Sequence, residues 1–332
     1  MTVARLALPI CALAIALLAA AVGSSFMSFD RVVAALIGTG SRADGIILWN
    51  IRLPRVCLAA LSGAALALAG VLLQRVTRNP LAAPSVLGVV DGAAVGVLVF
   101  LWVFSNESNA LTVSIHWQPV AAAFGAFSFA TCVAFLAKRD ISSPMRLILY
   151  GVACAALANA IVVLLIIAGP VYRASAALIW LAGSVHTADW REVTVLAIAL
   201  AISLPFIGAL LKPLDQLRLD DASAQATGLS VLHTRVGALV LSVSLTAAAV
   251  SVVGGIGFVG LIAPHAARLL FGTRALAQFV GAALIGMVMV MAADIIVRLA
   301  FQPLEVPAGA ITALVGAPYF LFLLIRRGRS YA

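Results

Sequence analysis

The sequence predicts an all-α polytopic membrane protein, with about ten transmembrane helices in a single domain over residues 1–332. Hydrophobic residues make up 64% of the chain and charged residues only 10%, against roughly 45–50% and about 25% in ordinary globular proteins. The mean hydropathy of +1.16 indicates more apolar side chain than a water-soluble fold of this length can bury. The apolar residues also gather in runs of about 20, the length of a helix that crosses a ~30 Å hydrocarbon core.

The first apolar run follows Arg5 and ends in small residues, as a secretory signal peptide also does. We interpret it as a retained helix over 5–24, because the distribution of basic residues agrees with a membrane crossing there. The eighth run is shorter than a full crossing requires. The predicted transmembrane helices are 5–24, 54–75, 85–104, 118–137, 145–167, 191–211, 232–253, 257–271, 277–299 and 307–325.

The basic residues predict that both termini are cytoplasmic. With this orientation, about twice as many of the 21 Lys and Arg residues fall on the cytoplasmic side as on the other side, which is the usual bias. The polar stretches 25–53 and 105–117 are then external loops, and the second of them has no Lys or Arg. The group of helices two to five begins on the external side, and the group of helices seven to ten begins on the cytoplasmic side. This order is consistent with an inverted repeat.

Several motifs point away from an enzyme. Gly255-Ile-Gly257-Phe-Val-Gly260 matches a dinucleotide-binding pattern, but it lies between apolar helices and predicts a glycine-rich break with close backbone packing. No Walker loop is present, so any ATP hydrolysis belongs to another subunit. The histidines lack metal-binding spacing and the four cysteines lie in apolar stretches, where we expect buried, inert thiols. We therefore predict no catalytic residue, no metal site and no cofactor bound by this chain.

Intramembrane acids are few. Asp294 has Arg298 four residues later on the same helix face, which predicts a local ion pair, although such acids also face transport pathways. Asp91 has no obvious partner and lies beside Gly92 in a seam of small residues at a spacing of four, which permits tight helix packing. A water-filled cavity beside Asp91 is the alternative.

Three arginines are expected at the external membrane face, where basic residues need a reason. Arg52 and Arg55 stand three residues apart at the outer end of the second helix, and Arg298 stands at the outer end of the ninth. Their side chains either extend to lipid headgroups or form a docking surface for acidic residues of an external protein. Because the basic residues do not form a cluster, a nucleic-acid partner is not expected.

The internal segment 212–231 alternates apolar and polar residues and reaches Gly228, a typical helix-ending residue. This pattern predicts one or two short amphipathic helices at the cytoplasmic surface. Such helices lie on the membrane or insert into a partner ATPase. Its adjacent acids, Asp220 and Asp221, are expected on a solvated loop face or at a helix start.

At these positions the chain resembles the FecCD permease family, the membrane subunits of ABC importers for ferric siderophores, haem and vitamin B12. The matching blocks occur in order between residues 52 and 325. They are Arg52-Leu53-Pro54-Arg55, Thr77-Arg78-Asn79-Pro80-Leu81-Ala82, Trp180-Leu181-Ala182-Gly183-Ser184, Gly257-Phe258-Val259-Gly260-Leu261 with Pro264-His265 and Arg268, Glu305-Val306-Pro307-Ala308-Gly309, and Thr312 to Pro318.

The resemblance implies a type II ABC importer permease in the bacterial inner membrane that moves ferric siderophore-type chelates from periplasm to cytoplasm. It implies a second, identical or paralogous permease subunit, two ATP-binding subunits, and a periplasmic or lipoprotein substrate-binding protein. Within the family, a cobalamin or haem importer stays open. An ion-coupled secondary transporter is the alternative outside the family, and it would need a relay of intramembrane acids.

The resemblance also implies roles for individual residues. Arg52, Arg55 and Arg298 match arginines that receive glutamates of the binding protein. The segment that couples to the ATPase contains Leu217, Leu219, Asp220, Ala222, Ala224 and Gly228. Asp91, Gly92 and Pro318 are candidates for the pathway, and Pro264, Pro307 and Pro318 are expected to bend helices. Asp91 departs from the Ser or Asn often found in the family, and Asp220 departs from Gly.

Overall fold

The computed structural model describes residues 2–23, 26–106, 110–138, 144–169, 171–301, 304 and 306–328. Within these ranges all regular secondary-structure elements are helices. Six helices are long and apolar enough to cross a membrane, and four shorter apolar helices accompany them. Together they correspond one to one to the predicted set. They are α1 (Thr2–Ala21), α4 (Leu53–Thr77), α5 (Val89–Val103), α6 (Gln118–Leu136), α7 (Pro144–Ala168), α9 (Trp190–Gln216), α11 (Val231–Val253), α12 (Val259–Phe271), α13 (Ala275–Ala300) and α14 (Ala308–Gly328).

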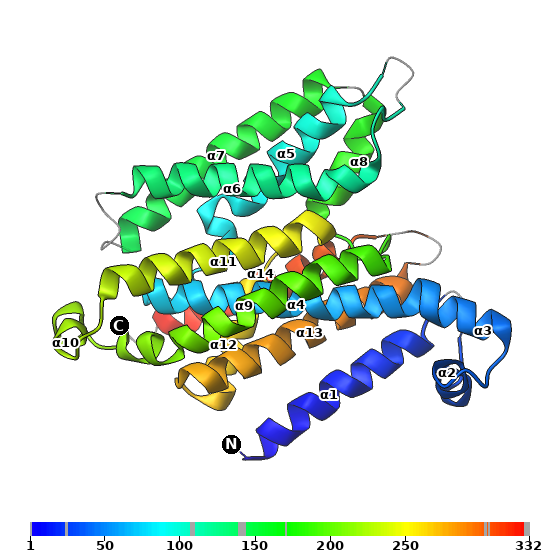
Figure 1. Cartoon of the computed structure of the whole chain (residues 1–332), viewed down its shortest axis with the longest axis horizontal. Helices are drawn as coiled ribbons and strands as arrows, with labels where there is room; N and C mark the ends of the chain where they lie inside the picture. Colours follow the sequence, from blue (N-terminus) through cyan, green and yellow to red (C-terminus); the bar gives the residue numbers. More distant parts are fainter. Residues whose placement is uncertain are drawn as a thin grey trace.

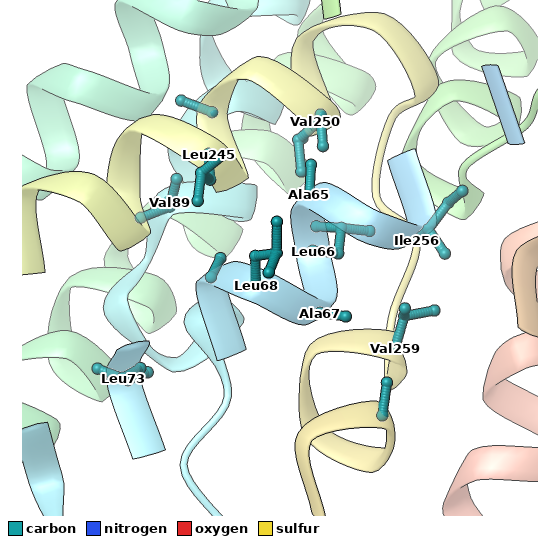
Figure 2. Close-up of a cluster of buried hydrophobic side chains, with 14 of the residues drawn as sticks. Ala65, Leu66, Ala67, Leu68, Leu73, Val89, Leu245, Val250, Ile256 and Val259 are labelled. Atoms are coloured by element: carbon teal, nitrogen blue, oxygen red, sulfur yellow. The ribbon is translucent and has the colours of Figure 1, made fainter. Parts of the chain in front are cut away.

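Helix α4 is the centre of the bundle and packs against α9, α11, α12 and α13. It is apolar on all sides, as expected of a fully enclosed helix. Figure 2 shows its segment from Ala65 to Leu73 among side chains such as Val89, Leu245 and Val259. In Figure 1, α5, α6, α7 and α8 (Val171–Ala182) form a group on one side of α11, while α1 lies on the far side of α13.

Small residues set the spacing between central helices. A Cβ placed on Gly63 of α4 would lie 2.1 Å from the carbonyl oxygen of Gly286 on α13, so only glycine allows this crossing. The predicted break also occurs: α11 ends at Val253 and α12 begins at Val259. At that break a Cβ on Gly70 would lie 1.9 Å from the carbonyl oxygen of Gly260.

The outer region is more helical than predicted. Residues expected as an external loop contain α2 (Phe29–Leu36), α3 (Arg42–Ile46) and a π-helix, η1 (Ile47–Arg52), that continues directly into α4. Short amphipathic helices have too little apolar surface for a hydropathy criterion, and here they bury it in a small separate core. Helix α8 was not predicted either. Short 3₁₀ turns, η2 (Pro84–Leu87) and η3 (Ile115–Trp117), precede α5 and α6.

Two further expectations are corrected. Only Cys154 of the four cysteines is buried, Cys57 is half-buried, and Cys11 and Cys132 are exposed. An apolar run cannot distinguish the bundle interior from a lipid-facing surface, because both are apolar. Pro307 precedes α14 and does not lie inside a helix, whereas Pro264 and Pro318 are inside α12 and α14.

The two ends of the bundle differ. Figure 1 places both chain ends near one end of the bundle, together with α10 (Asp221–Ala226), while α2 and α3 lie at the opposite end. We call the end with α10 the inner end and the end with α2 the outer end. Each end carries a group of arginines. The predicted docking residues lie at the outer end, and the predicted coupling residues lie at the inner end, in and around α10.

Candidate functional site

The outer arginine cluster consists of Arg52, Arg55, Asp294 and Arg298. Asp294 is 1% exposed. Its Oδ1 accepts hydrogen bonds from Nε of Arg55 at 2.8 Å and from Nη2 at 2.6 Å. Its Oδ2 lies 2.9 Å from Nη2 of Arg298, which confirms the predicted i, i+4 ion pair. A carboxylate this deeply buried needs such partners, because an uncompensated charge there is very costly.

Arg52 and Arg298 bind the carboxyl end of α1. Nη1 of Arg52 donates to the carbonyl oxygens of Ala20 at 2.8 Å and Ala21 at 2.7 Å. Nη1 of Arg298 donates to the carbonyl oxygens of Ala19 and Val22, at 2.9 and 2.6 Å. The last carbonyls of a helix lack helical donors and form the negative end of its dipole. The two guanidinium groups therefore neutralise this end of α1.

The cluster presents a limited surface to the outside. Arg52 and Arg298 are buried, at 4% and 8% exposure, so neither extends to lipid headgroups. The Arg55 side chain is 14% exposed, and its Nη1 lies 3.1 Å from Nδ1 of the exposed His186. The structure thus brings the three predicted docking arginines together and leaves Arg55 as the most accessible of them.

At the inner end, helix α10 forms the core of the predicted coupling segment. Asp220 is its N-cap, and the Asp220 side chain accepts a hydrogen bond from the backbone N–H of Ser223 at 3.0 Å. Hydrogen bonding with Ser223, through its side chain and then its backbone N–H, lowers the pKa of Asp220. Gly228 follows the helix with φ +85°, a conformation that favours glycine. The aspartate that departs from the family pattern is therefore a helix cap.

Asp221 attaches α10 to the bundle. Its two carboxylate oxygens accept hydrogen bonds from Nη1 and Nη2 of Arg235 on α11, both at 2.9 Å. Arg78, at the end of α4, donates to the same carboxylate at 2.8 Å. Burial alone would raise the pKa of Asp221, but the ion pairs with Arg235 and Arg78 hold it below its usual value. The expected helix start is confirmed for Asp220 and Asp221, but the ion pairs of Asp221 with Arg235 and Arg78 were not predicted.

The rest of the coupling segment divides into a buried and an exposed side. Residues 212–216, expected in a surface helix, are the last residues of α9, which continues to Gln216. Leu217 and Ala224 are buried, at 1% and 0% exposure. Leu219 is 44% exposed, and Ala222 is exposed as well. The exposed residues form the surface available to a partner.

Two arginines at the end of α4, Arg75 and Arg78, bind neighbouring elements at this end, and no local sequence pattern predicts their contacts. Arg78 donates to the carbonyl oxygens of Leu217, at 2.9 Å, and of Leu219. Nη1 of Arg75 is 3.1 Å from Oδ1 of Asp215. The other Arg75 hydrogen bonds go to the carbonyl oxygens of Leu214 and Thr273 and to Oε1 of Gln278.

The pathway candidates do not form one site within this subunit. Asp91 is half-buried on α5. A Cβ on Gly92 would lie 2.7 Å from Cβ of Phe129 on α6, so the predicted small-residue seam is a packing surface. Pro318 is exposed on α14. Among the described residues, no three His, Cys, Asp or Glu side chains are placed to hold a metal ion.

Comparisons with known proteins agree with this arrangement. The sequence model of the FecCD transport family matches residues 11–326. The chain is 42% identical over 318 residues to a protein of Bacillus subtilis (strain 168) named a probable siderophore transport system permease, YfhA, covering 96% of this chain and 92% of that one. It is 38% identical over 283 residues to the Fe(3+) dicitrate transport system permease FecD of Escherichia coli (strain K12), covering 84% and 85%.

The fold is also similar to that of a solved structure. A chain described as a metal-chelate type ABC transporter in an inward-facing conformation superposes with a TM-score of 0.85 and 27% sequence identity. The superposition covers 97% of this chain and 98% of that chain.

Proposed function

Because the chain belongs to the FecCD transport family, we propose that it is the membrane-spanning permease subunit of an ATP-driven importer for ferric siderophore-type chelates. The observation that carries this proposal is the match along nearly the whole chain to permeases named for siderophore and ferric dicitrate systems. The chain is a multi-pass membrane protein and not an enzyme. It works with ATP-binding and substrate-binding partners, which supply the energy and the cargo.

The transport cycle is alternating access. The loaded binding protein docks at the outer end and releases the chelate, and ATP binding and hydrolysis in the partner subunits act on the coupling segment. Both events bias the same two-state arrangement of helices, and their coupling is reciprocal at the level of binding. Asp221 supports this role, because its bonds to Arg78 and Arg235 link α10 to the end of α4 and to α11.

In the assembly, two permease subunits, identical or paralogous, pair with two ATP-binding subunits. Both termini face the cytoplasm, on the same side as α10. The pathway lies between the two permeases, so a residue exposed in one subunit, such as Pro318, faces it, and Asp91 adds polarity on the α5 side. The exposed surface formed by Leu219, just before α10, and by Ala222 on α10 inserts into the ATPase.

The outer arginine cluster receives the binding protein. An incoming carboxylate meets Arg55 first, since its side chain retains exposure and already bonds Asp294 and His186. Arg52 and Arg298 lie behind Arg55 and hold α1 in place. Docking at Arg55 therefore affects the positions of α1, α4 and α13. Charge complementarity of this kind contributes mainly to association rate and register.

Reconstitution tests this function. Proteoliposomes that contain the permease, its ATPase and the binding protein should accumulate a radiolabelled ferric chelate only when ATP is present. An ATPase variant that lacks the Walker lysine is the matched control and should abolish uptake. Uptake by the permease alone, driven by an imposed ion gradient, would instead establish the ion-coupled alternative. Substituting ferric citrate, a ferric hydroxamate or cobalamin as cargo identifies the substrate class.

A further inference from the structure

The inner end contains a cavity that the transport role does not explain. It has a volume of about 300 Å³ and lies between the ends of α4, α9, α12 and α13. This volume is at the small end of the range for ligand pockets. No acidic residue lines it, whereas four arginines do. The lining residues are Gln74, Arg75, Arg78, Leu214, Leu217, Arg218, Arg268, Thr273 and Gln278.

The positive charge of this cavity is only partly balanced. The two nearest acids are already used, since Asp215 pairs with Arg75 and Asp221 pairs with Arg78 and Arg235. The guanidinium groups of Arg218 and Arg268, both exposed residues, make no hydrogen bond or ion pair with any residue that the structure describes. They come from different elements, Arg218 just after α9 and Arg268 from α12. The cavity therefore brings two uncommitted guanidinium groups to one space.

A second, independent feature points to a ligand. Gln74 is 6% exposed and lines the cavity from α4. Its Nε2 donates to the carbonyl oxygen of Leu261 at 3.1 Å. Its Oε1 is buried and has no hydrogen-bond partner among the described residues. Because buried acceptors are nearly always paired, an occupant of this cavity is expected to present a donor as well as negative charge.

We propose that this cavity is a binding site for a phosphoryl group. Arg218 and Arg268 bind its oxygens, since the planar guanidinium group matches phosphate in a two-point contact. Oε1 of Gln74 accepts a hydrogen bond from the ligand. Inorganic phosphate offers this donor as its own O–H, and a phospholipid headgroup offers a hydroxyl or ammonium group. Bound phosphate would bridge α9 and α12 next to the coupling segment.

Binding of inorganic phosphate to the full chain tests the proposal, independently of transport. The chain is purified in a glycosidic detergent, stripped of phospholipid and titrated with phosphate by calorimetry. Arg218→Gln and Arg268→Gln should each weaken binding about tenfold, the typical loss for one charge-assisted hydrogen bond. Arg274→Gln is the matched control, because Arg274 directly precedes α13, its side chain makes no capping hydrogen bond, and it does not line the cavity. This variant should change binding less than about twofold.

Sulfate and a Gln74 variant test the role of the donor. Sulfate carries no proton at neutral pH, so the wild-type chain should prefer phosphate, and Gln74→Leu should remove this preference. Equal binding of both anions by the wild-type chain would remove Gln74 from the site. Each variant is first compared with the wild-type chain in gel filtration and in thermal unfolding without ligand, so that a folding defect is recognised.

A second arm separates the two sources of phosphoryl groups. The chain is placed in nanodiscs of phosphatidylglycerol or of a phosphate-free galactolipid, and retained lipids are identified by native mass spectrometry. Retention of phosphatidylglycerol by the wild-type chain and by Arg274→Gln, but not by the cavity variants, assigns the site to a lipid headgroup. Phosphate binding without such retention assigns it to a soluble phosphate. If neither probe depends on Arg218 and Arg268, the proposal is overturned.

Discussion

The arginines at the two ends of the bundle are used in opposite ways. In the outer arginine cluster every guanidinium group is bonded to the protein: Asp294 binds Arg55 and Arg298, and the end of α1 binds Arg52 and Arg298. At the inner end Arg78 and Arg235 share Asp221, whereas Arg218 and Arg268 have no described partner. The outer cluster is therefore a fixed joint, and the inner end keeps charge available for ligands and partners.

Burial explains the difference in strength. Asp294 is 1% exposed, so its ion pairs lie in a medium that screens them little. The Asp221 side chain is 38% exposed, and water and salt weaken its ion pairs. The same pair of residue types therefore supports a permanent contact at the outer end and a weaker, adjustable contact at the inner end.

The largest expected effect comes from Asp294→Asn. This change leaves Arg55 and Arg298 without their counter-charge at a buried position, which typically costs about 3–5 kcal/mol. We expect a marked fall in the thermal unfolding temperature of the detergent-purified chain, and the fall should persist at 1 M salt. Asp30→Asn, an exposed acid in the first turn of α2, is the control and should be close to neutral. Equal stability of both variants would mean that the outer cluster is not a joint.

Arg52→Gln should have the next largest effect. It removes the two hydrogen bonds from Nη1 to the carbonyl oxygens of Ala20 and Ala21, and hydrogen bonds from charged groups contribute about 1.5–3 kcal/mol. Loosening of α1 should appear as faster hydrogen exchange in its last turn, with α9 unaffected. Arg42→Gln, an exposed residue at the start of α3, should leave that exchange unchanged. Slow exchange in Arg52→Gln would show that Arg298 holds α1 by itself.

Some of the helices and contacts at the two ends could be predicted from the sequence, and others could not. Ten apolar helices were predictable, because length and hydropathy alone decide whether a segment can cross lipid. The Asp294–Arg298 pair was predictable from a spacing of four. The Arg55 contact with Asp294 was not, since the two residues are 239 positions apart and only the fold brings them together.

The short polar helices were also not predicted from the sequence. The helices α2 and α3 were expected as a loop, because each is too short and too polar to be detected as a membrane-crossing run. Asp221 was expected on a solvated face or at a helix start, but its ion pairs were not predicted, because Arg78 follows α4 and Arg235 lies on α11. In both cases the deciding contact is tertiary, and no local pattern records it.

Asp221→Asn should have a smaller effect on stability and a specific effect on coupling. The exposed position limits the loss of stability to about 1 kcal/mol, and high salt should remove most of it. Because α10 is then held less firmly to α4 and α11, we expect more ATP hydrolysed per chelate transported in proteoliposomes. Asp220→Asn is the matched control, since asparagine caps a helix as well as aspartate does. An unchanged ratio of ATP hydrolysed to chelate transported in Asp221→Asn would show that the bonds of Asp221 to Arg78 and Arg235 are not part of the coupling mechanism.

The pH dependence of α10 mobility tests whether Asp221 holds the inner end. The direction of the expected change follows from the lowered pKa of Asp221. An aspartate whose folded-state pKa is depressed stabilises the fold fully above its unfolded pKa of about 3.9, and this contribution is lost as the pH falls through the lower folded value. The pKa of Asp220 is lowered too, so the experiment uses the Asp220→Asn background, in which the cap does not titrate.

In that background, a fluorescent probe at Gln225→Cys in a chain without its native cysteines reports the mobility of α10. The signal should be flat from about pH 5 to 8 and should show release of α10 only below about pH 4, because ionised Asp221 holds the helix over the whole neutral range. Adding Asp221→Asn should give a mobile probe at every pH. Release of α10 beginning near pH 6 would show that a group other than Asp221 controls its mobility. The inner end would then not be held by a carboxylate with a salt-sensitive ion pair, and the contrast with the outer cluster would fail.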